Sequence, residues 1–367
     1  MAISVHGQVV PKVKNLSNRV AYIPIPLPSI GGGASIATLA FNSSALPVPK
    51  ISPKKVAGVK RSFPWVVIGY GKNNPNGNME AIRIRVYTES ALNQQKFGIP
   101  AARELMRIWE LDKTWLGIDH NYEYNQGVVD VYLCNEGSPG GEQLFGTDNE
   151  GGVVHKVNTI YIYNLKTFTD PLEEAREVAH EYGHAVLPAI GGYTAPEYWA
   201  NGYMGEELFL RWITKEIANR TLTSKDAMGA SLSSLQNWVK IHTQTIELKA
   251  AERGPQNPFL RESSAAGMDA YHGIMLYCDS IFPAHIFARA IAITPGNKAI
   301  DFVLGAKLAA EEATYSPNFP YYLLGKKVWI PVGGGKVINS VIFAKNNGWV
   351  EVMAKSGIIV RAGKIEN

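Results

Sequence analysis

Residues 170–192 contain the feature that most limits how this chain can fold, a helix whose two ends are both marked in the sequence. Asp170-Pro171 is typical of an N-cap followed by proline at the first helical position, and Glu173 lies where a capping box places an acid. Pro188 disfavours helix at Leu187, and Gly191-Gly192 ends the element. The apolar residues of the segment share one face: Ala175, Val178, Ala179, Tyr182 and Val186.

The same helix carries the sequence His180-Glu181-Tyr182-Gly183-His184. Residues four apart lie one turn above each other, so the imidazoles of His180 and His184 can reach a single metal ion. Glu181 lies at the edge of that face, where its carboxylate can touch a metal-bound water. Two neutral nitrogen ligands suit zinc, and a catalytic zinc site needs one further protein ligand. The alternative is a helix with two histidines whose hydrogen bonds are satisfied within the protein.

A second helix is predicted from Pro196 to about Ala218, and its apolar stripe lacks one member. The stripe consists of Trp199, Tyr203, Leu210, Ile213 and Ile217, and the missing position is Glu206. A carboxylate in an apolar face must be paired, hydrogen-bonded or bound to a metal, so Glu206 is the predicted third ligand. A buried ion pair of Glu206 is the alternative. Glu197 and Asn201 are weaker ligand candidates near the helix start, and Glu207 falls on a polar face that we expect to be solvated.

The motif with a glutamate on the following helix resembles the gluzincin metallopeptidases, which include thermolysin-like enzymes and zinc aminopeptidases. Gly202-Tyr203-Met204-Gly205-Glu206-Glu207 resembles their G-x-x-x-E segment, whereas a competing register, Trp199-Ala200-Asn201-Gly202, would put Asn201 at the ligand position and imply a damaged site. Alternating strands at Ile82–Tyr87, Val128–Leu133 and Thr159–Tyr163, with a helix over Pro100–Leu116, match the order of a gluzincin catalytic half.

The resemblance implies a zinc-dependent metallopeptidase that hydrolyses peptide (amide) bonds in a peptide or protein substrate. One Zn²⁺ per chain would be held by His180, His184 and Glu206, with a zinc-activated water and Glu181 as general base. Asp269–Met275 resembles the stretch that carries a transition-state tyrosine in aminopeptidase-like members, so Tyr271 is the first candidate donor and His272 the second. The alternative for Tyr271 is a core aromatic residue.

Other parts of the proposed site are less specified by the sequence. Asp279 and Glu177 are candidate acceptors for the other imidazole nitrogens. Thr159–Tyr163 is the candidate edge strand for an extended peptide, although its tyrosines could equally pack. The alternative is a catalytically inactive zincin-fold protein, which would bind a partner or a surface through its C-terminal β region.

The expected fold class is α+β. A zincin-like catalytic domain at residues 78–317, with a mixed sheet, an active-site helix and a helical C-terminal half, would be flanked by two smaller parts. Residues 1–77 form an N-terminal β or irregular region that ends in the turn Asn73–Gly77. Residues 318–367 form a small C-terminal β module, with strands at Lys327–Val332, Val337–Ala344, Trp349–Ala354 and Ile358–Val360.

Charge and composition narrow the partners. The net charge is +4, and the lysine pairs Lys54-Lys55 and Lys326-Lys327 are isolated, so nothing indicates nucleic-acid binding. No apolar run reaches the length of a transmembrane span. Cys134 and Cys278 both lie in apolar surroundings, which leaves two free thiols and one disulfide equally open. Low charge content and the Gly/Pro-rich N-terminal region favour a secreted or extracytoplasmic protein whose signal peptide is absent from this sequence.

Overall fold

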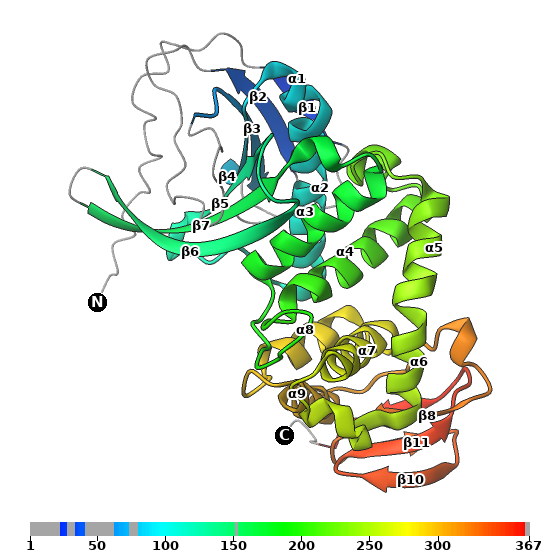
Figure 1. The fold of residues 1–367 in the computed structure, drawn as a ribbon. Coiled ribbons are helices and arrows are strands. Elements are labelled where there is room, and N and C mark those ends of the chain that lie inside the picture. Colours follow the sequence, from blue (N-terminus) through cyan, green and yellow to red (C-terminus); the bar gives the residue numbers. More distant parts are fainter. Residues whose placement is uncertain (1–22, 28–33, 41–61, 73–79, 151–152, 364–367) are drawn as a thin grey trace, which may run out of the picture.

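A seven-stranded mixed sheet forms the upper half of the molecule in Figure 1. The computed structural model describes residues 23–27, 34–40, 62–72, 80–150 and 153–363. The strands lie in the order β1-β2-β3-β4-β5-β7-β6, with β4, β5 and β7 parallel and the other pairs antiparallel. Their bounds are β1 Ile23–Pro26, β2 Ser35–Ala40, β3 Trp65–Lys72, β4 Glu80–Thr88, β5 Tyr124–Leu133, β6 Gly140–Glu150 and β7 Val153–Tyr163.

One long helical segment packs on this sheet. It consists of α1 (Ala91–Asn93), a π-helical turn (Gln94–Gly98), α2 (Ile99–Leu111) and a second π-helical turn (Asp112–Leu116). Met106 and Trp109 of α2 lie on Gly69 and Gly71 of β3, where a Cβ atom would come within 2.4 Å and 2.2 Å of these side chains. The absence of side chains at these two glycines therefore lets the helix approach the sheet, and the predicted helix at 100–116 is confirmed.

Two further helices, α3 (Pro171–Val186) and α4 (Asn201–Ala218), lie between the sheet and the lower half of the molecule (Figure 1). They cross at an unusually short distance, because a Cβ on Gly205 would lie only 2.5 Å from the Cα of Gly183. Asn158 of β7 donates from its amide to the carbonyl of Ala185 at 3.1 Å, which ties the end of α3 to the sheet.

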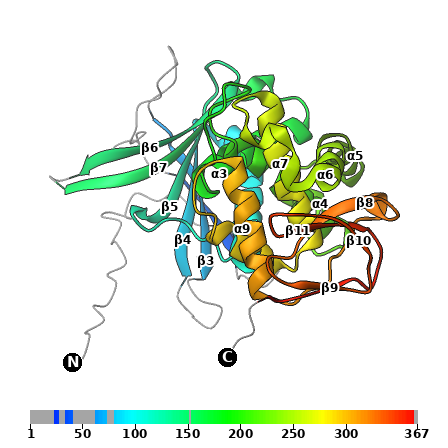
Figure 2. The ribbon, with the colours of Figure 1, turned by 90° about the horizontal axis from the view of Figure 1, so that it is seen from below.

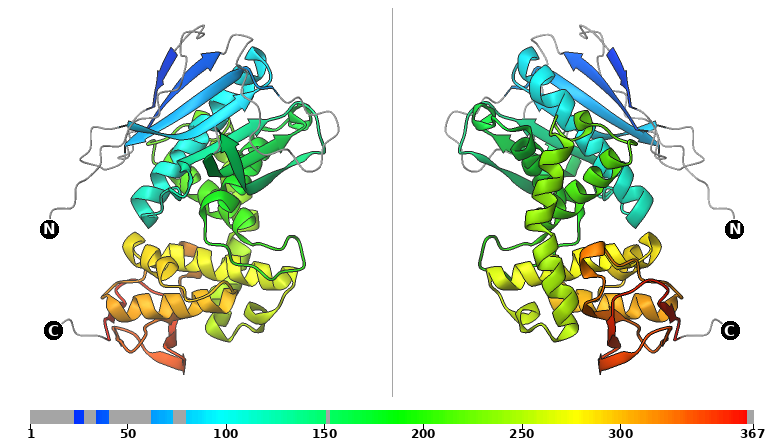
Figure 3. Two further views of the ribbon diagram at one scale, coloured as in Figure 1. Left: turned by 90° about the vertical axis from the view of Figure 1, so that its left-hand side faces the viewer. Right: turned by 90° about the vertical axis from the view of Figure 1, so that its right-hand side faces the viewer.

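The lower half consists of helices α6 to α9 and a small β module, drawn in yellow to red in both views of Figure 3, and α5 lies beside α4 above them (Figure 1). The helices are α5 (Leu232–His242), α6 (Gln244–Arg253), α7 (Ala265–Ile281), α8 (Ala284–Ala292) and α9 (Ala299–Glu312). Short 3₁₀ turns occupy Leu165–Thr167, Ser224–Asp226, Gly254–Gln256, Pro258–Arg261 and Tyr321–Leu323. Within the described ranges, none of the helices has the length and apolar character needed to cross a membrane.

The C-terminal module contains five short strands beside α9 (Figure 2). These are β8 (Lys327–Pro331), β9 (Lys336–Ile338), β10 (Ile342–Asn346), β11 (Trp349–Met353) and β12 (Ile359–Arg361), paired as β10-β11-β8 and β12-β9. The single strand predicted over Val337–Ala344 is wrong. Asn339 has a φ of 62°, a left-handed conformation that breaks the extended chain and separates β9 from β10.

The predicted α+β class with a mixed sheet is confirmed, but the boundary at residue 77 has no counterpart in the sheet. Strands β3 and β4 pair directly across it, so β1 to β3 extend the same sheet. The predicted turn Asn73–Gly77 and the run Gly31–Gly33 lie outside the described residues. Cys134 and Cys278 are both buried and free.

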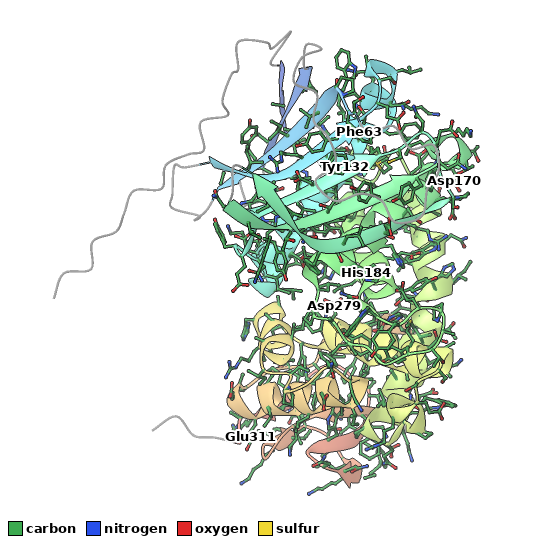
Figure 4. The ribbon with its side chains drawn as sticks, turned by 60° about the vertical axis from the view of Figure 1, so that its left-hand side comes forward. Phe63, Tyr132, Asp170, His184, Asp279 and Glu311 are labelled. Atoms are coloured by element: carbon green, nitrogen blue, oxygen red, sulfur yellow. The ribbon has the colours of Figure 1, made fainter. Side chains whose placement is uncertain are left out.

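The prediction that Thr159–Tyr163 forms an edge strand is wrong, since β7 lies between β5 and β6. Its tyrosines pack instead. Tyr161 stacks on Tyr132 and Tyr163 in an aromatic layer on the far face of the sheet, where Figure 4 labels Phe63 and Tyr132. The edge is β6, which the sequence analysis did not predict as a strand.

Candidate metal centre

Helix α3 begins and ends where the sequence predicts, and it places His180 and His184 on one face. Asp170 caps it by accepting a hydrogen bond from the amide of Leu172 at 3.0 Å. The predicted capping box does not form, because Glu173 accepts both of its hydrogen bonds from Arg176 on the next turn. Figure 4 shows His184 between the sheet and the lower helices.

The third member of the group is Glu197. Its Oε2 lies 3.5 Å from Nε2 of His180 and 3.3 Å from Nε2 of His184. Glu197 is not on a helix, because α4 begins only at Asn201. The preceding residues form a loop in which Gly191 pairs with Trp199, and this loop turns the carboxylate back towards α3.

These three side chains could hold a metal ion. Two atoms that each lie about 2.1 Å from a tetrahedral zinc are about 3.4 Å apart, which matches both distances from Glu197. The imidazoles also occupy space that only glycine leaves free, since a Cβ on Gly202 would lie 2.3 Å from Nε2 of His184 and 2.6 Å from Nε2 of His180. Donor type, spacing and packing are therefore all compatible with a bound metal ion.

The other nitrogen of each imidazole has its own acceptor. Nδ1 of His180 donates to Oε2 of Glu206 at 3.3 Å, and Nδ1 of His184 donates to Oδ1 of Asn201 at 2.8 Å. A proton on Nδ1 leaves the lone pair of Nε2 free for a metal. Helix α4 thus orients both imidazoles towards Glu197.

The predicted third ligand, Glu206, lies outside the group of three. Its side chain is buried (4% exposed), as the apolar stripe predicts, and Oε1 accepts a hydrogen bond from Nε of Arg176 at 2.5 Å. This is the buried ion pair that the sequence left as the alternative. The register that placed Asn201 at the ligand position also differs from the structure, in which Asn201 supports His184.

Glu181 lies beside the group with a free oxygen. Its side chain is buried, and Oε2 has no hydrogen-bond partner among the described residues. Burial raises the pKa of the Glu181 carboxyl to about 7, although the imidazoles of His180 and His184 oppose the shift. Gly141 of the edge strand β6 lies directly on it, because a Cβ there would be 2.5 Å from Cγ of Glu181.

The electrostatics favour a positive charge at this place. Burial disfavours the charged imidazolium, but hydrogen bonds to Glu197 and Glu206 outweigh it and raise the pKa of His180 to about 10. Burial likewise disfavours the carboxylate of Glu197, but hydrogen bonds from the two histidines lower its pKa to about 2. Without a metal, the proton on His180 supplies the positive charge that pairs with Glu197. A bound cation would supply that charge instead.

The two predicted oxyanion donors lie elsewhere. Tyr271 is buried in the core, and its hydroxyl donates to Sδ of Met275 at 3.1 Å. His272 is also buried, with Nε2 donating to the carbonyl of Ala200 at 3.1 Å and Nδ1 lying 3.1 Å from Oε2 of Glu207. Glu207 is consequently not solvated as expected. His272 instead joins Glu207 to the carbonyl of Ala200 at the start of α4.

A tyrosine that the sequence analysis assigned only to the apolar stripe lies at the centre. The ring of Tyr203 is 4.7 Å from that of His180, edge to face. Burial and the negative charge of Glu197 raise the pKa of its hydroxyl. The stripe of α4 predicted that Tyr203 and Glu206 share a face, but not that this face meets His180.

The two acceptors suggested by the sequence do not reach the imidazoles. Asp279 accepts from Nε1 of Trp212 at 3.1 Å and lies 3.6 Å from Nε of Arg211. For Glu177, burial raises the pKa of the carboxyl, and its Oε1 would lie 3.9 Å from a Cβ on Gly140 at the start of β6.

One signal could have identified Glu197. Asp170-Pro171 begins a helix with a capping side chain, but Ala195-Pro196 has no such side chain before its proline. Pro196 therefore belongs to a turn, and the residues after it are free to point towards a neighbouring helix. No protein-family model matches this chain, and a search of curated proteins finds no match either.

Proposed function

We propose that this protein is a zinc-dependent metallopeptidase in which His180, His184 and Glu197 hold the metal. The observation that carries the proposal is the convergence of these three donors beside Glu181, a buried carboxylate with an unpartnered oxygen. A carboxylate with a pKa near 7 is suited to accept and return a proton at neutral pH. Structural zinc sites are closed by four protein ligands, whereas three ligands and an adjacent base are typical of catalytic ones.

The roles of the residues follow from their contacts. A bound zinc would polarise the substrate carbonyl and lower the pKa of a water molecule at this place. Glu181 would accept a proton from a water molecule as its oxygen bonds to the carbonyl carbon, and would return that proton to the amine nitrogen as the C–N bond breaks. Glu206 and Asn201 hold the two imidazoles in orientation, and Arg176 holds Glu206.

The proposal keeps the resemblance to gluzincins but changes one of its parts. In that group the third ligand is a glutamate on the following helix, whereas Glu197 precedes α4. The helix still contributes Glu206, which orients His180 rather than replacing Glu197. Tyr203 replaces Tyr271 as the candidate donor to the transition state, because its ring lies 4.7 Å from that of His180.

An extended peptide is the substrate that suits the edge strand. β6 pairs only with β7 among the described strands, so its outer edge can add a further strand. Gly141 of β6 lies on Glu181, and a peptide paired to this edge would therefore run beside the proposed base. Backbone hydrogen bonds of this kind give affinity without requiring one particular side chain.

The test compares metal content and proteolysis in four proteins: wild type, Glu197→Ala, Glu206→Ala and Glu181→Gln. Metal content is measured by mass spectrometry after incubation with zinc and gel filtration. We expect about one zinc per chain in wild type and Glu181→Gln, none in Glu197→Ala, and weakened binding by roughly 10- to 100-fold in Glu206→Ala.

Proteolysis is measured with an unfolded protein substrate, and only wild type should cleave it at full rate. Zinc without cleavage in wild type would favour the inactive binding protein instead. If Glu197→Ala retains zinc and Glu206→Ala loses it, the third ligand is Glu206 of α4. If none of the four proteins binds zinc, the wild type included, the proposal is wrong.

A further inference from the structure

The C-terminal module has a local excess of positive charge. Residues 326–363 contain six lysine or arginine side chains and one carboxylate, Glu351, whereas the whole chain has a net charge of only +4. The module lies at the opposite end of the molecule from the sheet (Figures 1 and 3). Figure 4 places Glu311, which contacts Gly333 of the module, well below His184. An activity at this end is therefore separate from the metal centre.

A hollow of about 490 Å³ lies in this module, between the glycine run 333–335 and the β10–β11 turn. The aliphatic residues Val337 and Ile342 line it and are partly exposed, with the buried Val332 and Val350 behind them. Lys336, Lys345 and Asn347 also line it, and all three are exposed. The hollow thus combines an apolar lining with exposed cationic and amide donors.

The cations of the hollow have no carboxylate partner within the described part of the chain. No ion pair joins Lys336 or Lys345 to an acid. A third cation, Lys307 of α9, packs along the turn, since a Cβ on Gly348 would lie 2.7 Å from its Cε. Glu311 of the same helix lies on the opposite rim, since its Oε1 would lie 3.5 Å from a Cβ on Gly334, so its charge offsets that of Lys307. The two lysines that line the hollow, Lys336 and Lys345, remain to attract a negatively charged ligand.

The lining also limits the class of that ligand. Single-stranded nucleic acids need exposed aromatic rings for stacking, and the aromatic residue here, Trp349, is only 1% exposed. An anionic glycan would leave the aliphatic lining without a counterpart. A peptide that presents an apolar side chain between carboxylates satisfies both parts of the surface, and a volume of about 490 Å³ accommodates a short segment.

We propose that this hollow binds an acidic peptide segment, with an apolar side chain against the aliphatic lining and flanking carboxylates on Lys336 and Lys345. The site does not depend on the metallopeptidase function. If both hold, the module would recruit acidic protein substrates or partners at a distance from the metal centre, which increases their local concentration.

Binding is measured by calorimetry on the full chain carrying Glu181→Gln, so that the peptide is not consumed. The probe is an acetylated and amidated hexapeptide of alternating Glu and Leu, with Gln-for-Glu and Ser-for-Leu versions as controls. We expect the probe to bind and each control peptide to bind at least about tenfold more weakly.

Two charge-matched double variants locate the site. Lys336→Glu with Lys345→Glu should weaken binding about tenfold or more, because two attractions become repulsions. Lys249→Glu with Lys355→Glu makes the same change of net charge at exposed lysines outside the hollow, and should change binding less than about threefold. Circular dichroism checks that each variant is folded.

Equal weakening in the two double variants would mean that only net charge matters, and would overturn the proposal. The same holds if the Gln peptide binds as well as the Glu peptide, or if the probe fails to bind while an oligonucleotide or an anionic vesicle does. Loss of zinc or of proteolysis in the parent protein would contradict the proposed function but leave this result unaffected.

Discussion

Gly202→Ala tests the packing of the metal centre without changing any proposed ligand. A Cβ on Gly202 would lie 2.3 Å from Nε2 of His184 and 2.6 Å from Nε2 of His180. Ordinary contacts between non-bonded heavy atoms are about 3.5 Å, so each nitrogen would have to retreat by roughly 1 Å. Both nitrogens belong to the proposed ligand set, and both imidazoles are partly exposed at the far end of a side chain that can rotate.

We expect Gly202→Ala to reduce the affinity for zinc more than it reduces the free energy of unfolding. A functional site tolerates displacements of about 0.5 Å, so two ligands that retreat by twice that distance should weaken zinc binding at least about 100-fold. Overpacking of a helix start costs about 1–3 kcal/mol in the free energy of unfolding, and outward rotation of the rings should keep the cost near the lower value.

Zinc affinity is measured by competition with a chromophoric chelator, and stability by urea denaturation with a chelator present. Gly98→Ala is the matched control, because Gly98 also has helical backbone angles and the nearest atom to a Cβ there is the methyl carbon of Thr88, at the much longer distance of 3.1 Å. We expect this control to bind zinc like wild type. If Gly202→Ala also binds zinc with wild-type affinity, the imidazoles do not need the space that Gly202 leaves free.

Three further predictions concern stability. Arg176→Met removes the guanidinium from the buried carboxylate of Glu206, which among the described residues keeps only its hydrogen bond from His180. The free energy of unfolding should fall by about 2–3 kcal/mol in urea denaturation, with partial recovery on adding Glu206→Gln. Gly205→Ala places a Cβ against the backbone of α3, which cannot yield as a side chain does, so the melting temperature should fall by several degrees. Glu207 raises the pKa of His272 against the opposing effect of burial, so this pair stabilises the protein fully below about pH 6.5 and progressively less as pH rises through the folded-state pKa. The stability difference between wild type and Glu207→Gln should therefore be largest at pH 6 and shrink at alkaline pH, and a constant difference would contradict this assignment.

Local sequence signals correctly predicted the ends and the buried face of a helix or strand where these depend only on residues of the same element. Helix α3 starts at the expected cap and ends before Pro188, because caps and prolines act on the backbone within one turn. The apolar stripe of α4 correctly placed Glu206 in a buried position. Strand β6 escaped prediction because Gly140, Gly141 and its polar residues resemble a loop, and only pairing with β7 makes it a strand.

The chain by itself therefore determined the helix with His180, Glu181 and His184 on it, the burial of Glu206, and the α+β class. The tertiary structure alone decided which carboxylate completes the candidate metal-binding group. Glu197, Asn201 and Glu206 all lie within reach along the sequence, but the loop before α4 turns Glu197 towards Nε2 of both imidazoles, while Glu206 is held between Arg176 and Nδ1 of His180. A ligand set depends on the relative positions of two helices and a loop, and these positions are set by packing between segments far apart in the chain, such as the contact of Gly183 with Gly205.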